Sequence, residues 1–164
     1  MKNKKRILIL SDLILLLVII AVVICFWNKP KAVEGDEPAF TPVLEPNAVV
    51  QTDGMGQTAE QIEGIRIPGY PRITVEADTT DVIMNLKNPE GNPCYFTFEI
   101  VLTDENETIY VSKMVEPGKA VTNVTLSRAL NKGEYPAMIK ITTTSLTDGL
   151  PMNGANVETT IVAQ

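Results

Sequence analysis

Hydrophobic and polar residues follow two different patterns along this chain, and the change between them divides it into parts. Residues Ile7–Trp27 form an apolar run that only Ser11 and Asp12 interrupt. From residue 65 to residue 164, short stretches of alternating apolar and polar residues are separated by turn-forming residues. The first pattern is typical of a membrane-spanning helix, and the second is typical of β-strands with one buried face.

The apolar run is long enough to cross a bilayer. As a helix, Ile7–Trp27 would extend about 31 Å, which matches the hydrocarbon thickness of a membrane. Four basic residues precede the run: Lys2, Lys4, Lys5 and Arg6. Positive charge stays on the cytoplasmic side, and no small-residue cleavage site follows the run. We therefore expect a cytoplasmic tail (1–6), an uncleaved single-pass signal-anchor helix in the cytoplasmic membrane (7–27), and an extracytoplasmic C-terminal part.

Asp12 places a carboxylate inside the predicted span. A charged group at the bilayer centre costs on the order of 3 kcal/mol, and less near the interface. Two interpretations stay open for this residue. It lies at the cytoplasmic interface near Lys5 and Arg6, or it pairs with a polar group on a partner helix.

Residues 28–64 lack a sustained hydrophobic period and are rich in proline, glycine and acidic residues. This composition is typical of a flexible tether. Within it, Ala39–Leu44 could become ordered against the domain or a partner, and Ala59–Ile62 could form a helical turn. We expect a flexible linker over 28–64 and one folded extracytoplasmic domain over 65–164.

The last 100 or so residues predict about seven short strands. They are Arg72–Ala77, Asp81–Lys87, Cys94–Leu102, Thr108–Met114, Ala120–Leu126, Glu134–Thr144 and Val157–Ala163. Leu146–Asn156, rich in glycine and proline, is expected to be a loop. Pro136 lacks a backbone donor and should lie at an edge or beside a bulge. Short strands at this spacing, without crossover helices, predict an all-β fold, an immunoglobulin-like antiparallel β-sandwich.

One local signature supports this fold. Gly133 stands two residues before Tyr135, which opens a predicted strand, and in such sandwiches a tyrosine at this corner bonds upstream backbone. Three features together resemble membrane-anchored immunoglobulin-like modules of Gram-positive bacterial surface proteins: the Pro117-Gly118 turn, Leu126 with Leu130, and Gly133 with Tyr135. The resemblance covers residues 65–164 and implies an extracytoplasmic module, without indicating a ligand.

The net charge of the chain limits the classes of partner that it can bind. The chain carries a net charge of −6, and the part beyond the predicted span is still more acidic. This argues against binding nucleic acid or anionic lipid through a basic surface.

Cys25 lies in the predicted span and Cys94 in a predicted strand, so they cannot pair within one chain. A buried free thiol is the favoured state of Cys94, with an intermolecular bridge as the alternative.

The chain contains no histidine. This excludes Ser-His-Asp and Cys-His catalysis and most zinc sites. A Ser-Lys dyad would have to use residues of solvated strands and turns: Ser112, Ser127 or Ser145 with Lys113, Lys132 or Lys140. We therefore expect a protein that is not an enzyme.

Two acidic clusters are candidate calcium ligands. Asp78 lies near Asp81, and residues 104–107 read Asp-Glu-Asn-Glu. Calcium requires several oxygen ligands that converge from loops, and the spacing of an EF-hand is absent. Solvated turn acids are the favoured interpretation, and no cofactor is expected.

An intramolecular isopeptide bond is a further hypothesis. Some pilin-like sandwich domains, which resemble this one only in general fold, join a lysine to an asparagine across neighbouring strands with the help of a buried carboxylate. The candidates here are Lys87 or Lys140, Asn153 or Asn156, and Glu99. The alternation turns Glu99 towards solvent, which weakens this hypothesis.

These observations predict a non-enzymatic, membrane-anchored interaction module, a subunit or accessory factor of a cell-envelope protein assembly. It would bind a protein partner through loops or a strand edge. The alternative is binding of a carbohydrate or cell-wall polymer, for which Tyr70 and Tyr110 are the best exposed candidates. Aromatic residues make up only 5% of the chain, so this alternative ranks second.

Overall fold

The computed structural model describes residues 40–51 and 64–164. These residues belong to one compact unit, Ala39–Gln164. The predicted tail and span, with Asp12, lie outside the described residues. No helix within the described residues is long and apolar enough to cross a membrane.

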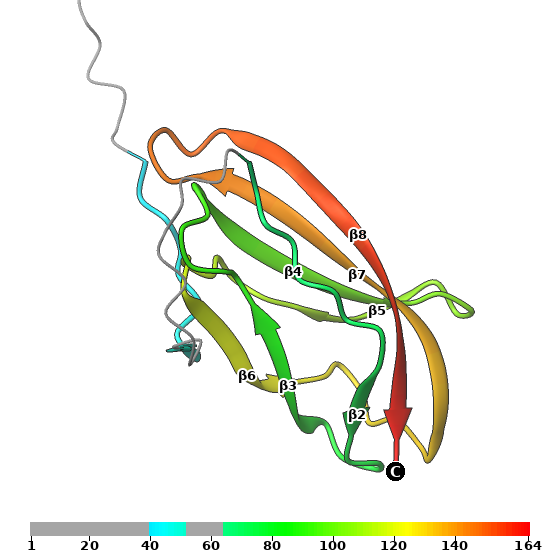
Figure 1. Ribbon diagram of the computed structural model, residues 1–164. Coiled ribbons are helices and arrows are strands. Elements are labelled where there is room, and N and C mark those ends of the chain that lie inside the picture. The colour runs from blue at the N-terminus through cyan, green and yellow to red at the C-terminus, as the bar shows by residue number, and fades with distance from the viewer. Residues whose placement is uncertain (1–39, 52–63) are drawn as a thin grey trace, which may run out of the picture. The chain divides into compact units, whose positions relative to one another are not determined.

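Eight strands in the described part form two sheets that enclose a common core (Figure 1). They are β1 (Ala48–Val50), β2 (Ile73–Val75), β3 (Asp81–Lys87), β4 (Cys94–Leu102), β5 (Glu107–Val111), β6 (Lys119–Thr125), β7 (Gly133–Ser145) and β8 (Pro151–Ala163). The strand orders are β1-β6-β3 and β2-β8-β7-β4-β5. This confirms an all-β sandwich. Its pairing is antiparallel except between β2 and β8, which run parallel.

The alternation of apolar residues in β3 and β4 builds the core. Leu86 of β3 faces inward, as do Phe96, Phe98 and Ile100 of β4, and none of the four has exposed surface. The rings of Phe96 and Phe98 meet edge to face, with centroids 5.9 Å apart. Burying a side chain of this size stabilises the fold by roughly 1.5–3 kcal/mol. The bounds predicted for β3 and β4 agree with the structure.

The closing strand β8 is longer than predicted. Leu146–Asn156 was expected to be a loop, but β8 begins at Pro151, which pairs with Thr144. The β7–β8 register shifts between Ile141 and Thr143, and a Cβ atom at Gly154 would lie only 2.2 Å from the Ile141 carbonyl oxygen. The glycine and proline that predicted a loop therefore belong to an irregular stretch of a long hairpin.

The described part of the predicted linker packs on the domain. β1 pairs with β6, and Leu44 forms an isolated bridge with Met114. The Glu45 amide donates to the Met114 carbonyl at 2.8 Å, and the Glu45 carboxylate accepts from the Lys113 amide at 2.9 Å. The bridge at Leu44 agrees with the expectation that Ala39–Leu44 could become ordered against the domain. For the rest of residues 40–51 a flexible tether is the wrong prediction, because a three-residue strand carries no readable period.

Pro136 lies in β7, an interior strand. The last β4–β7 pair is Leu102 with Ala137, and the Pro136 carbonyl accepts from the Thr103 amide at 3.0 Å. The nitrogen and carbonyl of one residue point the same way in an antiparallel pair. The nitrogen of Pro136, which carries no hydrogen, therefore points towards Thr103, one residue beyond the end of β4. Proline is tolerated there because no β4–β7 pair has to accept a hydrogen bond from it.

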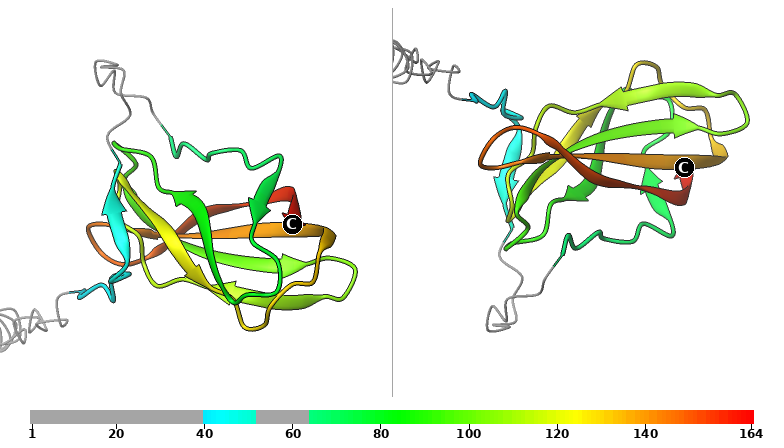
Figure 2. Two further views of the ribbon diagram at one scale, coloured as in Figure 1. Left: turned by 90° about the horizontal axis from the view of Figure 1, so that it is seen from below. Right: turned by 90° about the horizontal axis from the view of Figure 1, so that it is seen from above.

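The two ends of the sandwich carry different features. The turn between β7 and β8 and the start of the segment 40–51 lie at one end, and the C-terminus lies at the other (Figure 2). The loop before β7 also lies at the C-terminal end.

Candidate functional site

β3 is an edge strand, hydrogen-bonded to β6 alone among the described strands. The Leu126 amide donates to the Thr80 carbonyl at 2.8 Å, and Ile83 lies opposite Asn123. Backbone groups alternate in direction along a strand, so the N–H and C=O of Ile83 point away from β6. The Ile83 side chain is 75% exposed. We call Asp81–Ile83 the β3 edge.

Backbone positions on both sides of Ile83 are covered. The Lys87 amide donates to the Tyr70 hydroxyl at 2.9 Å, and the register shifts between Ile83 and Leu86. The Asp81 amide donates to Thr79 Oγ1 at 3.2 Å. Capped donors and bulges are the usual protection of an edge strand against pairing. Ile83 lies in the gap between these protected positions.

Two hollows flank Ile83. One of about 410 Å³ lies between β3 and β2, and Glu76 and Gln164 help to line it. The other, about 110 Å³, lies against β6, with Asn123 and Thr125 in its lining. An extended peptide along the β3 edge would find backbone partners at Ile83 and room for side chains on both sides.

β5, an edge strand of the five-stranded sheet, is less open. Val111 is exposed there, but the Ser127 amide donates to the Ile109 carbonyl at 2.8 Å and covers part of the strand. The β3 edge is therefore the better candidate for strand addition.

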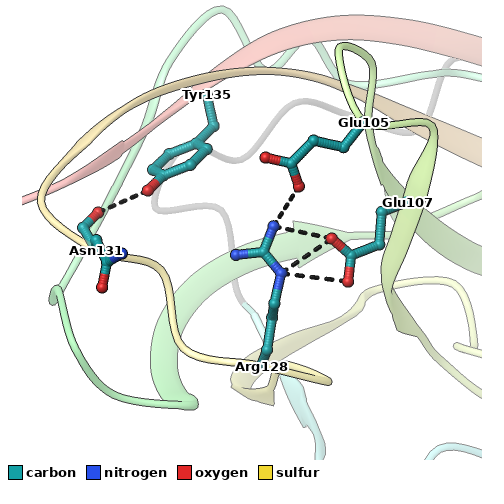
Figure 3. A network of polar contacts seen from close by, with 5 residues as sticks. All are labelled: Glu105, Glu107, Arg128, Asn131 and Tyr135. Atoms are coloured by element: carbon teal, nitrogen blue, oxygen red, sulfur yellow. Dashed lines mark hydrogen bonds and ion pairs between the residues drawn. The ribbon is translucent and has the colours of Figure 1, made fainter.

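Arg128 joins the β4–β5 hairpin to the loop before β7 (Figure 3). Its Nε donates to both carboxylate oxygens of Glu107, at 2.9 and 3.2 Å, and its Nη2 also contacts Glu105. The hydrogen bonds from Arg128 hold the pKa of Glu107 below its ordinary value, and these carboxylates raise the pKa of Arg128. Two acids of the candidate calcium cluster at 104–107 thus bind a guanidinium group.

Tyr135 lies near this network and forms the bond expected of a tyrosine corner. Its hydroxyl donates to the Asn131 carbonyl at 2.9 Å (Figure 3). A Cβ atom at Gly133 would lie 3.6 Å from the Tyr135 ring.

The other candidate calcium ligands do not converge. Asp81 accepts from Thr125 Oγ1 at 2.8 Å, and Asp78 adopts a left-handed backbone with φ of 60°. Across residues 40–51 and 64–164, no three acidic, cysteine or histidine side chains gather as metal ligands.

Three of the five isopeptide candidates lie in one row. Lys140 of β7 lies opposite Glu99 of β4 and opposite Asn156 of β8, and its Nζ is 3.7 Å from Glu99 Oε1. The row lies on a solvent-facing surface, with the side chains of Lys140 and Glu99 44% and 35% exposed. Lys87 belongs to the other sheet, and Asn153 lies close to the β7–β8 turn. The row is an exposed ion pair, unlike the buried setting that the hypothesis requires.

The two tyrosines expected to be exposed are half-buried. Tyr70 and Tyr110 pack against the core, and burial raises the pKa of each to about 12. Carbohydrate binding therefore loses its expected aromatic platform. Cys94 is a buried free thiol whose pKa is raised by burial, as expected.

A buried pair of asparagines was missed by sequence reasoning. Asn88 Nδ2 donates to the carbonyls of Cys94 and Val115, both at 2.9 Å, and Asn92 Nδ2 donates to Asn88 Oδ1 at 2.8 Å. Asn92 also bonds the Arg66 amide and carbonyl, at 2.8 and 3.0 Å. Through these hydrogen bonds the pair connects Arg66, near the start of the predicted domain, to Cys94 at the start of β4. The repeated Asn-Pro in Asn88–Pro93 was the available signal, but it predicted only a turn.

Two of the three candidate nucleophiles, Ser112 and Ser145, make structural side-chain contacts. Ser112 accepts from the Phe98 amide at 2.9 Å and donates to the Lys113 carbonyl at 2.7 Å, and Ser145 Oγ lies 3.0 Å from Thr147 Oγ1.

No protein-family model, curated protein or solved structure matches this chain.

Proposed function

We propose that this chain is a non-enzymatic, membrane-anchored interaction module of the cell envelope. Ile7–Trp27 would hold it in the cytoplasmic membrane with the N-terminus inside, and the β-sandwich would bind a protein partner outside. The four basic residues before the apolar run support this orientation. The protein would act as a subunit or accessory factor of a larger assembly.

We also infer that the sandwich is of the immunoglobulin type. In that fold, strands B and E are neighbours in one sheet, and strands C, F and G are neighbours in the other. The pairs β3–β6 and β4–β7–β8 have these relations, and β1 takes the place beside β6 that strand D would occupy. The bond from Tyr135 to Asn131 lies at the start of β7, where strand F of that fold has its tyrosine corner.

The proposal that the sandwich binds a protein rests on the exposure of Ile83. Within residues 40–51 and 64–164, the side chain of Ile83 is 75% exposed and its backbone groups point away from β6, the strand that pairs with β3. A partner that adds a strand would bury this side chain, which is worth roughly 1.5–3 kcal/mol, and would pair its backbone groups. The covered positions on both sides would fix where such a strand begins and ends.

Photo-crosslinking in cells tests this proposal. A photoreactive residue would replace Ile83 in the full-length protein, and Thr142, exposed on β7 of the other sheet, would serve as the control position. We expect one discrete adduct from position 83 and none from position 142. Adducts of equal yield at both positions, or none at position 83, would contradict binding at the β3 edge.

A substitution gives the complementary test. Ile83→Lys should reduce, at least several-fold, co-purification of the partner that crosslinking identifies, while leaving the midpoint of urea unfolding nearly unchanged, because the side chain is exposed. Undiminished recovery of the partner would argue against the proposed contact.

A further inference from the structure

The turn between β7 and β8 presents exposed aliphatic side chains. Leu150 is 61% exposed, and Leu146 and Met152 are also exposed. We call these three residues the hairpin tip. The Ser145 amide donates to the Leu150 carbonyl at 2.9 Å, and the Leu146 amide donates to the Pro93 carbonyl at 3.2 Å. The backbone of the tip is therefore fixed while its apolar side chains face outward.

The hairpin tip belongs to a stretch of low charge. Asp148 is the only charged residue from Ile141 to Val157, in a chain of which 21% is charged. Its carboxylate accepts from the Leu150 amide at 3.1 Å, and a hydrogen bond from Ser145 holds its pKa below the ordinary value. An apolar tip with one ionised group suits the interface of a neutral bilayer better than its hydrocarbon centre or an anionic surface.

The N-terminal segment reaches the domain at this same end. The Phe40 ring packs on Gly149 so closely that a Cβ atom there would lie 2.3 Å from it, and its centroid is 6.1 Å from that of Tyr95. Both figures place the start of this segment beside the β7–β8 turn, opposite the C-terminus (Figures 1 and 2). Residues 28–39 alone separate Phe40 from the predicted span, and a chain of that length reaches at most about 40 Å.

We propose that the hairpin tip inserts shallowly into the outer interface of the bilayer in which the chain is anchored. This rests on the proposed membrane anchor. A short tether holds the tip near the membrane at an effective concentration on the order of millimolar, so a weak affinity is sufficient. The long strands β7 and β8 then lead away from the membrane, and the C-terminal end of the sandwich faces outward.

Quenching by brominated lipid tests the insertion. Full-length protein would be reconstituted in phosphatidylcholine vesicles with or without bromine on the acyl chains. Trp27→Phe removes the one native tryptophan, Thr147→Trp places a reporter in the turn, and Lys132→Trp places the control at the other end of β7. A dissociation constant equal to the millimolar effective concentration keeps the tip inserted about half of the time. Brominated lipid should then reduce the fluorescence emission of Thr147→Trp by roughly a third to a half. Emission from Lys132→Trp should not change.

Two further measurements separate the possible failures. Adding Leu146→Ser and Leu150→Ser to the Thr147→Trp protein should abolish the quenching, and persistent quenching would overturn the role of the tip. Vesicle flotation reports the anchor independently. Protein that floats without quenching overturns the tip proposal alone, whereas protein that does not float overturns both the anchor and the tip proposal.

Discussion

Thr143 has a buried hydroxyl without a protein partner. The residue has no exposed surface, and its Oγ1 makes no hydrogen bond within the described residues. A buried unpaired polar group costs about 1–3 kcal/mol, and valine has nearly the same shape. We expect Thr143→Val to raise the free energy of unfolding by about 1 kcal/mol, measured by urea denaturation.

The neighbouring Thr142 provides the matched control. Its side chain is exposed, so Thr142→Val should change the free energy of unfolding by less than about 0.5 kcal/mol. A less stable Thr143→Val protein would show that the hydroxyl contributes an interaction that the structure does not contain.

Asn92 joins two parts of the chain through buried hydrogen bonds. Removing its amide would leave Asn88 Oδ1 and the backbone of Arg66 without their partners. We expect Asn92→Ala to destabilise the domain by about 2–4 kcal/mol in urea denaturation. Asn123→Ala, at an exposed position of β6, should have little effect. Similar losses in both variants would argue against the amide network as a fastening.

At the scale of elements, β1 is held by a short ladder to β6. The Gln51 amide donates to the Gly118 carbonyl at 3.0 Å, so alternation directs the Val49 amide to β6 and the Val50 amide away from it. Val49→Pro should therefore accelerate hydrogen exchange at the Ala120 amide at least tenfold, a loss of about 1.4 kcal/mol in local protection. Val50→Pro should leave that exchange nearly unchanged. Equal effects would contradict the register.

The Arg128 network joins the β4–β5 hairpin to the loop before β7 and should make stability depend on pH. Arg128 lowers the pKa of Glu107 in the folded state, so its contribution is fully present above the ordinary value of 4.5 and is lost as pH falls below it. The stability difference between the natural protein and Arg128→Gln should be largest near pH 7 and should shrink by pH 3. Arg72→Gln breaks a more exposed pair with Glu134 and should show a smaller difference. A difference that does not vary with pH would contradict this network.

The elements differ in how well their sequences specified them. The bounds of β3 and β4 were predicted to the residue, because the alternation of both strands meets the dense turn signal Asn88–Pro93 that separates them. β1 was missed because three residues contain too little alternation. The first half of β8 was missed because Pro151 and Gly154 usually mark loops, whereas here they fit an irregular hairpin.

At the scale of the whole molecule, the candidate site could not be predicted from local pattern. Alternation placed Ile83 on the outer face of its strand, but whether β3 is an edge depends on the order of strands far apart in sequence. The cap that Tyr70 provides at Lys87 likewise depends on tertiary contact. Edges, caps and tips are properties of the assembled sandwich, whereas the core and the predicted anchor are properties of local sequence.

Labelling of cysteines introduced one at a time, compared with the natural protein in intact cells, tests most directly the claim that the β-sandwich is held outside the membrane. A membrane-impermeant maleimide would be applied to full-length Lys132→Cys, an exposed site, and to Asn3→Cys in the predicted cytoplasmic tail. Native Cys94 is buried and should react slowly with the reagent. We predict that Lys132→Cys is labelled in intact cells and that Asn3→Cys is labelled only after permeabilisation. Protection of Lys132→Cys until the cells are permeabilised would contradict the proposed orientation and the function built on it.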